Sequence, residues 1–182
     1  SPEVDKYEDL KLYAEYTDFN GVPVTTALTT ANVLDVFDKF MEEMDDAEVP
    51  QEGRIMYVTP KVHTLLKQAQ QIQRTLEVTA NNGEVKRSVR SLDEVTLKSV
   101  PSSRMKTLYN FTEGAVPDAA AKQINMILIH PDAVVAPIKY EFVSLDQPSA
   151  TTGGKYFYYE RAYWDVFAFE KKVPGIKMHV DA

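Results

Sequence analysis

Apolar residues recur at helical spacing in three segments of the first 70 positions. The clearest segment predicts a helix over residues 32–44, because its apolar positions follow the i, i+4, i+7, i+8, i+11 pattern of one buried face. These positions are Val33, Phe37, Phe40, Met41 and Met44. Thr29 or Thr30 can cap this helix. A second helix is predicted after Thr59-Pro60, a capping residue followed by a first-position proline. Its apolar stripe consists of Val62, Leu65, Leu66 and Ala69.

The chain opens with a third predicted helix, over residues 1–16. Ser1 can cap it, Pro2 suits the first helical position, and the acidic residues of the first turn favour the positive end of the helix dipole. Its apolar residues fall roughly on one face: Val4, Tyr7, Leu10 and Ala14. Asn20-Gly21, followed closely by a proline, predicts the turn that ends it.

Strand patterns dominate the rest of the chain. The predicted strands cover residues 54–58, 124–129, 138–145, 155–171 and 176–180. The run at 124–129, INMILI, is continuously apolar, as expected of a strand buried on both faces. In the long strand at 155–171, aromatic residues occupy both faces. We interpret it as a core and interface strand, because the two faces of a central strand pack against different neighbours.

Weaker patterns fill the remaining segments. Residues 72–106 predict twisted β-structure with a turn at Asn81-Asn82-Gly83. Residues 110–120 predict a loop in which Asp118 can cap a very short helix, and His130-Pro131-Asp132 predicts the start of another. Residues 148–154 predict a loop. The expected fold class is therefore α+β.

Composition narrows the class of protein. The 182 residues are 44% hydrophobic and 26% charged, which is ordinary for one or two small globular domains. No apolar run is long enough for a membrane span, and the acidic start does not fit a signal peptide. The absence of cysteine excludes disulfides and thiolate metal sites.

The net charge of −7 is unevenly distributed. Residues 1–50 contain 13 acidic and 3 basic side chains, whereas the remaining residues contain 14 acidic and 17 basic ones. One interpretation is a solvated acidic face. The other is that one end of the subunit is complementary to another, as head-to-tail assembly requires.

No set of residues predicts an enzyme. His63, His130 and His179 lie singly, without a second ligand at metal-binding spacing. The acidic cluster of residues 42–46 lacks the alternating ligands of a calcium loop, and Gly153-Gly154 lacks the lysine and serine of a phosphate-binding loop. Arg161 and Asp165 are able to form an ion pair, which would be structural and not a catalytic dyad. We therefore predict no catalytic, cofactor-binding or metal-binding residues.

The most basic segment, residues 86–106, leaves three interpretations open. Lys86, Arg87 and Arg90 can bind phosphates of a nucleic acid, contribute to a subunit interface, or form a solvated face. The acidic balance of the whole chain and the absence of an aromatic stacking platform in the segment disfavour nucleic-acid binding.

The order of these segments resembles the major capsid (coat) proteins of tailed bacteriophages and prophages. VDKY is similar to the start of their spine helix, and GRIMYVTP to the strand–helix unit of their axial domain. INMILIHPDAVVAPIK resembles their segment of apolar strand, His-Pro and short helix. RAYWDVFAFEKKVPGIKMHV resembles their closing strand with Arg-x-Tyr-x-Asp and their terminal strand. The match covers nearly all 182 residues in the expected order.

The resemblance implies a subunit of two parts. The axial domain, residues 25–145, is expected to gather around five-fold and six-fold axes. Residues 1–24 and 146–182 are expected to form part of the peripheral domain, with the spine helix and the closing strands. The N-terminal arm and extended loop of such proteins have no counterpart here, which implies a truncated core. Since the chain also starts without Met, we expect the native chain to continue upstream.

The resemblance also implies a function. The chain is expected to be a structural subunit of an icosahedral capsid, assembling in the cytoplasm of a bacterial host into pentamers and hexamers that enclose double-stranded DNA. Its partners would be copies of itself, scaffolding and portal proteins, and packaged DNA held without specificity, with no membrane and no cofactor. Two alternatives stay open: another phage structural or interaction protein with an α+β core, or a nucleic-acid-binding module that uses Lys86, Arg87 and Arg90.

Overall fold

The computed structural model describes residues 2–69, 89–112 and 114–182. The helices are α1 (Pro2–Asp18), α2 (Val33–Asp46) and α3 (Pro60–Gln68), with short 3-10 helices η1 (Ser102–Arg104), η2 (Pro131–Ala133) and η3 (Glu170–Gly175). The strands of the central sheet are β1 (Ile55–Val58), β2 (Ser91–Leu92), β3 (Val95–Ser99), β6 (Ile124–Ile129) and β11 (Ile176–Val180). The other strands form two-stranded sheets: β4 (Tyr109–Asn110) with β5 (Val116–Pro117), β7 (Val134–Val135) with β10 (Phe167–Ala168), and β8 (Ile138–Asp146) with β9 (Phe157–Trp164).

The central sheet has the order β11-β6-β1-β3-β2, so its middle strands come from distant parts of the chain. Strand β6 is antiparallel to both β1 and β11, whereas β1 and β3 are parallel. Five of its six residues are buried, which confirms the prediction of a strand covered on both faces.

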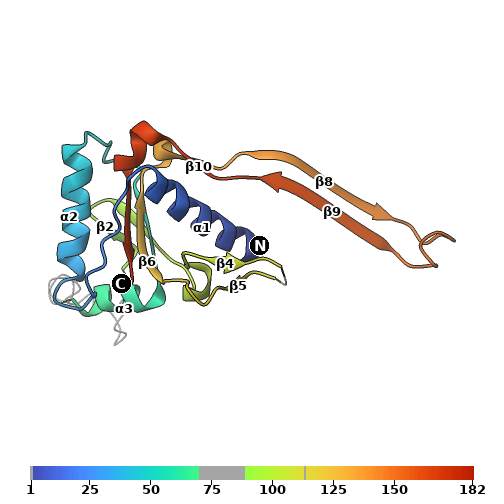
Figure 1. Ribbon diagram of the computed structural model, residues 1–182, viewed down its shortest axis with the longest axis horizontal. Helices are drawn as coiled ribbons and strands as arrows, with labels where there is room; N and C mark the ends of the chain where they lie inside the picture. The colour runs from blue at the N-terminus through green and yellow to red at the C-terminus, as the bar shows by residue number, and fades with distance from the viewer. Residues whose placement is uncertain (1, 70–88, 113) are drawn as a thin grey trace, which may run out of the picture.

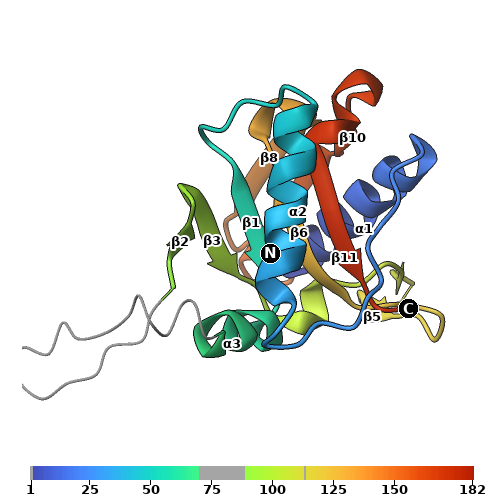
Figure 2. The same cartoon turned by 90° about the vertical axis from the view of Figure 1, so that its left-hand side faces the viewer.

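Helices cover the two faces of this sheet. Met126 and Leu128 point from β6 into a cluster with α2 and α3, whereas Ile127 belongs to the cluster under α1. Figure 2 shows α2 in front of the sheet and α1 behind it. The alternation follows from the two-residue period of a strand, which sends successive side chains to opposite faces.

The start of the chain is fastened to its end. The Val24 amide donates to the Met178 carbonyl at 2.9 Å, and the Val180 amide donates to the Val24 carbonyl at 2.9 Å. Just before this contact α1 ends at Asp18. Asn20 follows with a φ of 63°, and the Gly21 amide donates to the Tyr16 carbonyl. A side chain at Gly21 would lie 2.4 Å from the Tyr16 ring, so the close approach requires glycine.

Most predicted elements are present. The α2 stripe is confirmed, with Val33, Phe37, Phe40 and Met44 buried, and so is the unit of β1 and α3 with Thr59 at the N-cap. For α2, Asn32 takes the N-cap position without a side-chain bond to the helix. Its amide instead donates to the Thr29 hydroxyl at 3.3 Å. The predicted turn at 81–83 lies outside the described residues.

Three local predictions are wrong. The buried residues of α1 are Leu12 and Tyr16, not the predicted stripe, because the helix rests on the sheet with its second half. Asp118 caps no helix; its carboxylate accepts from the Ala120 amide in a turn after the β4–β5 pair. The aromatic segment is not one core strand: it breaks at Asp165 between β9 and β10, and β9 is mostly exposed.

Figure 1 shows where this strand lies. Strands β8 and β9 form a long hairpin that projects from the body of the molecule, with the turn at its far end. The hairpin leaves the body beside η2 and returns through β10. The molecule therefore consists of a compact body and one extended arm, named here the β8–β9 hairpin.

Candidate assembly surface

The β8–β9 hairpin exposes large apolar side chains on both of its faces. Tyr156 is 65% exposed, Leu145 59% and Tyr158 58%, although such residues are ordinarily buried. The other strongly exposed residues of the hairpin are Ile138, Tyr140, Phe142, Val143, Phe157 and Tyr163. An exposed apolar surface of this extent is typical of a contact with another protein.

The hairpin is stabilised by pairs across its own strands. The ring centroids of Tyr140 and Tyr163 are 6.0 Å apart, and those of Phe142 and Tyr159 are 6.1 Å apart. Such cross-strand aromatic pairs contribute roughly 0.2–1 kcal/mol each. They keep the hairpin in register while Tyr140, Phe142 and Tyr163 stay exposed.

The base of the hairpin is fixed to α1. The Tyr7 hydroxyl donates to the Asp165 carboxylate at 3.0 Å, and the Tyr7 ring stands edge-on to Trp164 at 6.3 Å. Burial and the nearby Asp165 carboxylate raise the pKa of Tyr7. The ion pair considered between Arg161 and Asp165 does not form. The Asp165 carboxylate accepts a hydrogen bond from Tyr7, and the Arg161 guanidinium lies 5.6 Å from the centre of the Tyr159 ring. The contacts of Tyr7 with Trp164 and Asp165, and not an ion pair, therefore fix the direction of the hairpin.

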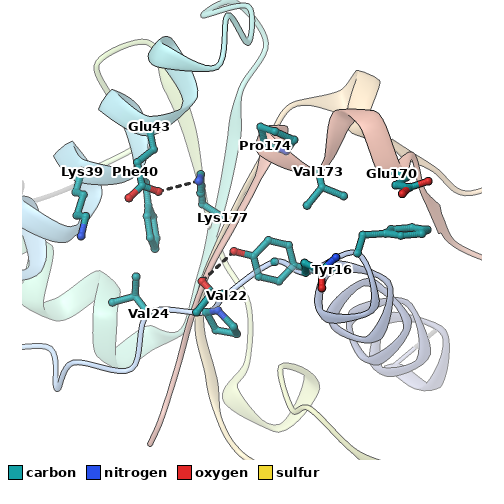
Figure 3. A pocket seen from close by; sticks show the side chains of 14 residues that line it. Tyr16, Val22, Val24, Lys39, Phe40, Glu43, Glu170, Val173, Pro174 and Lys177 are labelled. Atoms are coloured by element: carbon teal, nitrogen blue, oxygen red, sulfur yellow. Dashed lines mark hydrogen bonds and ion pairs between the residues drawn. The ribbon is translucent and has the colours of Figure 1, made fainter.

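One hollow has a volume of about 620 Å³ and lies where α1 ends, beside α2 and η3. Figure 3 shows Lys177 reaching across it to Glu43 at 2.7 Å, and the Tyr16 hydroxyl donating to the Val22 carbonyl. Lys39 and Glu170 lie on opposite sides of the hollow, so its charges do not converge on one point. The arrangement fastens α1, α2 and β11 together and provides no set of groups for catalysis.

The three histidines each bond to a backbone carbonyl. His63 Nε2 lies 3.1 Å from the Val89 carbonyl oxygen, and His130 Nε2 lies 3.1 Å from that of Glu52. His179 Nε2 lies 2.6 Å from the Thr26 carbonyl oxygen. Each ring connects two segments distant in sequence, which is a structural role. Among residues 2–69, 89–112 and 114–182, no group of three or more acidic or histidine side chains is arranged to hold a metal ion.

The acidic end of α2 has a role that sequence reasoning missed. Arg54 is fully buried, and its guanidinium contacts the Asp45 carboxylate at 2.6 Å and the carbonyls of Pro50 and Val49. Together with the Glu43–Lys177 pair, this contact uses two carboxylates of the 42–46 cluster as fasteners. A single arginine before a strand gives no sequence signal of such a role.

Two other features considered in the sequence, the basic segment and the Gly153-Gly154 pair, add little to the candidate assembly surface. Lys86 and Arg87 lie outside the described residues, and Arg90 is exposed next to β2. Gly153 and Gly154 both have positive φ in the turn of the hairpin, where their conformational freedom closes the loop. No helix in the part of the chain that the structure describes is long and apolar enough to cross a membrane.

Comparison with solved structures identifies the fold. The chain is similar to a chain of Mycobacterium phage Che8, with a TM-score of 0.60 and 13% identity, covering 98% of this chain and 58% of that one. It is also similar to the capsid structure of the cyanophage P-SCSP1u, with a TM-score of 0.61 and 11% identity, covering 95% and 61%. For the mature capsid of bacteriophage PhiM1 the TM-score is 0.60 and the identity 18%, covering 88% and 51%. No protein-family model matches the sequence, and no curated protein matches it.

The chain therefore has the α+β fold of phage major capsid proteins, as the order of its sequence segments predicts. It spans between about half and three-fifths of the length of the three phage chains. At this level of identity the similarity establishes the architecture, and the function follows from it only as a proposal.

Proposed function

We propose that the chain is a structural subunit of a phage capsid, which associates with copies of itself to form the shell. The observation that carries the proposal is the β8–β9 hairpin, an apolar arm exposed on both faces, on a body with the phage capsid fold. A monomer that kept this arm in water would leave its apolar surface unburied, whereas a shell subunit buries such surface against its neighbours.

The finer parts of the proposal concern the assembly. Residues 25–145 would form the axial domain of pentamers and hexamers, and residues 1–24 and 146–182 part of the peripheral domain. Strand β11 would join the second part to the first, because it pairs with β6 in the central sheet. The shell would enclose double-stranded DNA in the virion, after assembly with scaffolding and portal proteins in the bacterial cytoplasm.

The proposed role is structural and not enzymatic. The three histidines and Arg54 serve the fold: the histidines bond to backbone carbonyls, and the buried arginine fastens a helix to a strand. Shell formation requires burial of apolar surface with charges setting the orientation, and no chemical step by the subunit.

Electron microscopy of the native gene product, expressed with and without its phage scaffolding protein, tests the proposal. Rings or closed shells are the expected result. Native protein that remains monomeric under both conditions, at concentrations at which phage capsids assemble, would overturn it.

A further inference from the structure

A second hollow lies between α1 and the central sheet, with a volume of about 460 Å³. We name it the acidic cleft, after Asp5, Glu8 and Asp9, which line it from α1. Its opposite wall is apolar, formed mainly by Val100, Pro101, Ile127, Ile129, Val134 and Val166. Charge on one wall and apolar surface on the other suit a side chain with an aliphatic stem and a cationic end.

Asp9 is the unusual group of this cleft. Its carboxyl is surrounded by protein atoms, although the residue keeps some accessible surface through the mouth of the cleft. No hydrogen bond or ion pair joins it to any residue in the described ranges. Burial first, and then the charges of Asp5 and Glu8, raise the pKa of Asp9 to about 8. A carboxyl that is partly shielded from water and receives no donor from its own chain is available to a donor that enters through the mouth of the cleft.

The arginine that lines the cleft, Arg104, does not supply this donor. Arg104 is 2.7 Å from the Asp5 carboxylate, and no basic group lowers the pKa of Asp9, so Asp9 has no counter-charge from its own subunit. A metal ion does not fit either, because the described side chains form no metal-binding group. A lysine or arginine side chain from another polypeptide is the remaining chemistry, since it brings charge and hydrogen-bond donors together.

The β8–β9 hairpin carries side chains of this kind. Lys139, Lys155 and Arg161 are exposed on it, and none forms an ion pair with an acidic residue of the described chain. Aromatic residues flank two of them: Tyr156 follows Lys155, and Tyr159 lies beneath the Arg161 guanidinium. Figure 1 shows the hairpin directed away from the body, so its outer part cannot return to the cleft of its own subunit.

We propose that the acidic cleft of one copy receives a basic side chain from the β8–β9 hairpin of a second copy, with Asp9 as its carboxylate partner. The inference rests on the proposed self-assembly and adds which surfaces meet. Because the hairpin and the cleft are different parts of the subunit, the contact is head-to-tail, the type that closes rings.

Cross-linking between two single-cysteine variants tests this contact, since the chain has no cysteine of its own. Ser99→Cys marks the mouth of the cleft, and Ala150→Cys marks the turn of the hairpin; both positions are exposed. The two proteins, one carrying a size tag, are mixed with a short bis-maleimide linker. The matched control replaces Ser99→Cys by Thr30→Cys, an exposed position next to α2 on the opposite face of the sheet.

The expected result is a mixed dimer from Ser99→Cys and Ala150→Cys that is about tenfold more abundant than the control dimer. Asp9→Asn in the cleft partner should remove most of this excess, and so should Lys→Gln or Arg→Gln at one of the three basic positions in the hairpin partner. Equal yields for Ser99→Cys and Thr30→Cys, or an excess insensitive to all four substitutions, would overturn the inference. If shells form by electron microscopy without the cleft cross-link, self-assembly stands and only this contact fails.

Discussion

At the scale of single residues, Asp9 makes the stability of the fold depend on pH. Its carboxyl has a pKa of about 8 in the folded chain, against 3.8 for a free aspartate, with burial as the main cause. Between these values the unfolded chain loses the proton while the folded chain keeps it. The contribution of this group is therefore fully present below about pH 4 and is lost as pH rises through 8, by at most about 1.4 kcal/mol per pH unit.

Asp9→Asn should remove this dependence, because the amide stays neutral at every pH. We expect the free energy of unfolding of the variant, relative to the original chain, to increase steadily from pH 5 to 8 and to level off above it. Urea unfolding at a series of pH values measures this difference. Asp46→Asn, at an exposed position at the end of α2, is the control and should give curves parallel to the original chain. Parallel curves for Asp9→Asn as well would show that Asp9 is not buried.

Arg54 is the second residue on which stability depends. Arg54→Met keeps most of the buried volume but removes the donors to the Pro50 and Val49 carbonyls and the partner of Asp45. We expect a loss of about 2–4 kcal/mol, measured by chemical denaturation. The control is Arg104→Met, which breaks the half-exposed pair with Asp5 and should reduce stability by less than about 1 kcal/mol. Equal losses for the two variants would contradict a special role of Arg54.

At the scale of elements, a substitution in the β8–β9 hairpin should impair assembly while leaving the free energy of unfolding almost unchanged. Phe142→Ser removes an aromatic ring that is 44% exposed and paired only with rings of the hairpin itself. The free energy of unfolding should change by less than about 1 kcal/mol, because the core is untouched. Shells or rings of the native product should nevertheless form less readily, as counted by electron microscopy.

Phe37→Ala in α2 is the control for Phe142→Ser. Phe37 is fully buried in the cluster between α2 and the sheet, so its loss should reduce stability by about 3–5 kcal/mol. If Phe142→Ser destabilised the chain as much as Phe37→Ala, the hairpin would be part of the core and not an arm.

The same hairpin shows what the sequence could and could not predict. Helix α2 and strand β6 were predictable because burial on one face or on both leaves a periodic or continuous apolar pattern. Strand β9 has an equally apolar pattern, yet it is mostly exposed, because an apolar pattern does not tell whether other parts of the same chain cover the strand. The partners of Arg54 and Asp9 were not predictable, since they arise from contacts between segments that only the fold brings together.

At the scale of the whole molecule, the charge distribution bears on how a shell built from this chain would treat its contents. The net charge is −7, and the acidic side chains are concentrated in residues 1–50, which include α1 and α2. A protein with this balance repels duplex DNA except where a basic segment is locally exposed. The most basic segment of the sequence is residues 86–106.

We therefore expect the chain to bind duplex DNA only weakly at low salt, as measured by fluorescence anisotropy. Replacing Lys86, Arg87 and Arg90 together by glutamine should change this weak signal little, because few phosphate contacts are made. A micromolar dissociation constant that rises steeply with salt and is abolished in the triple variant would instead support a nucleic-acid-binding module. Weak binding would agree with the proposed capsid role, in which the shell would confine DNA by enclosure and its largely acidic subunits would not hold the DNA through specific contacts.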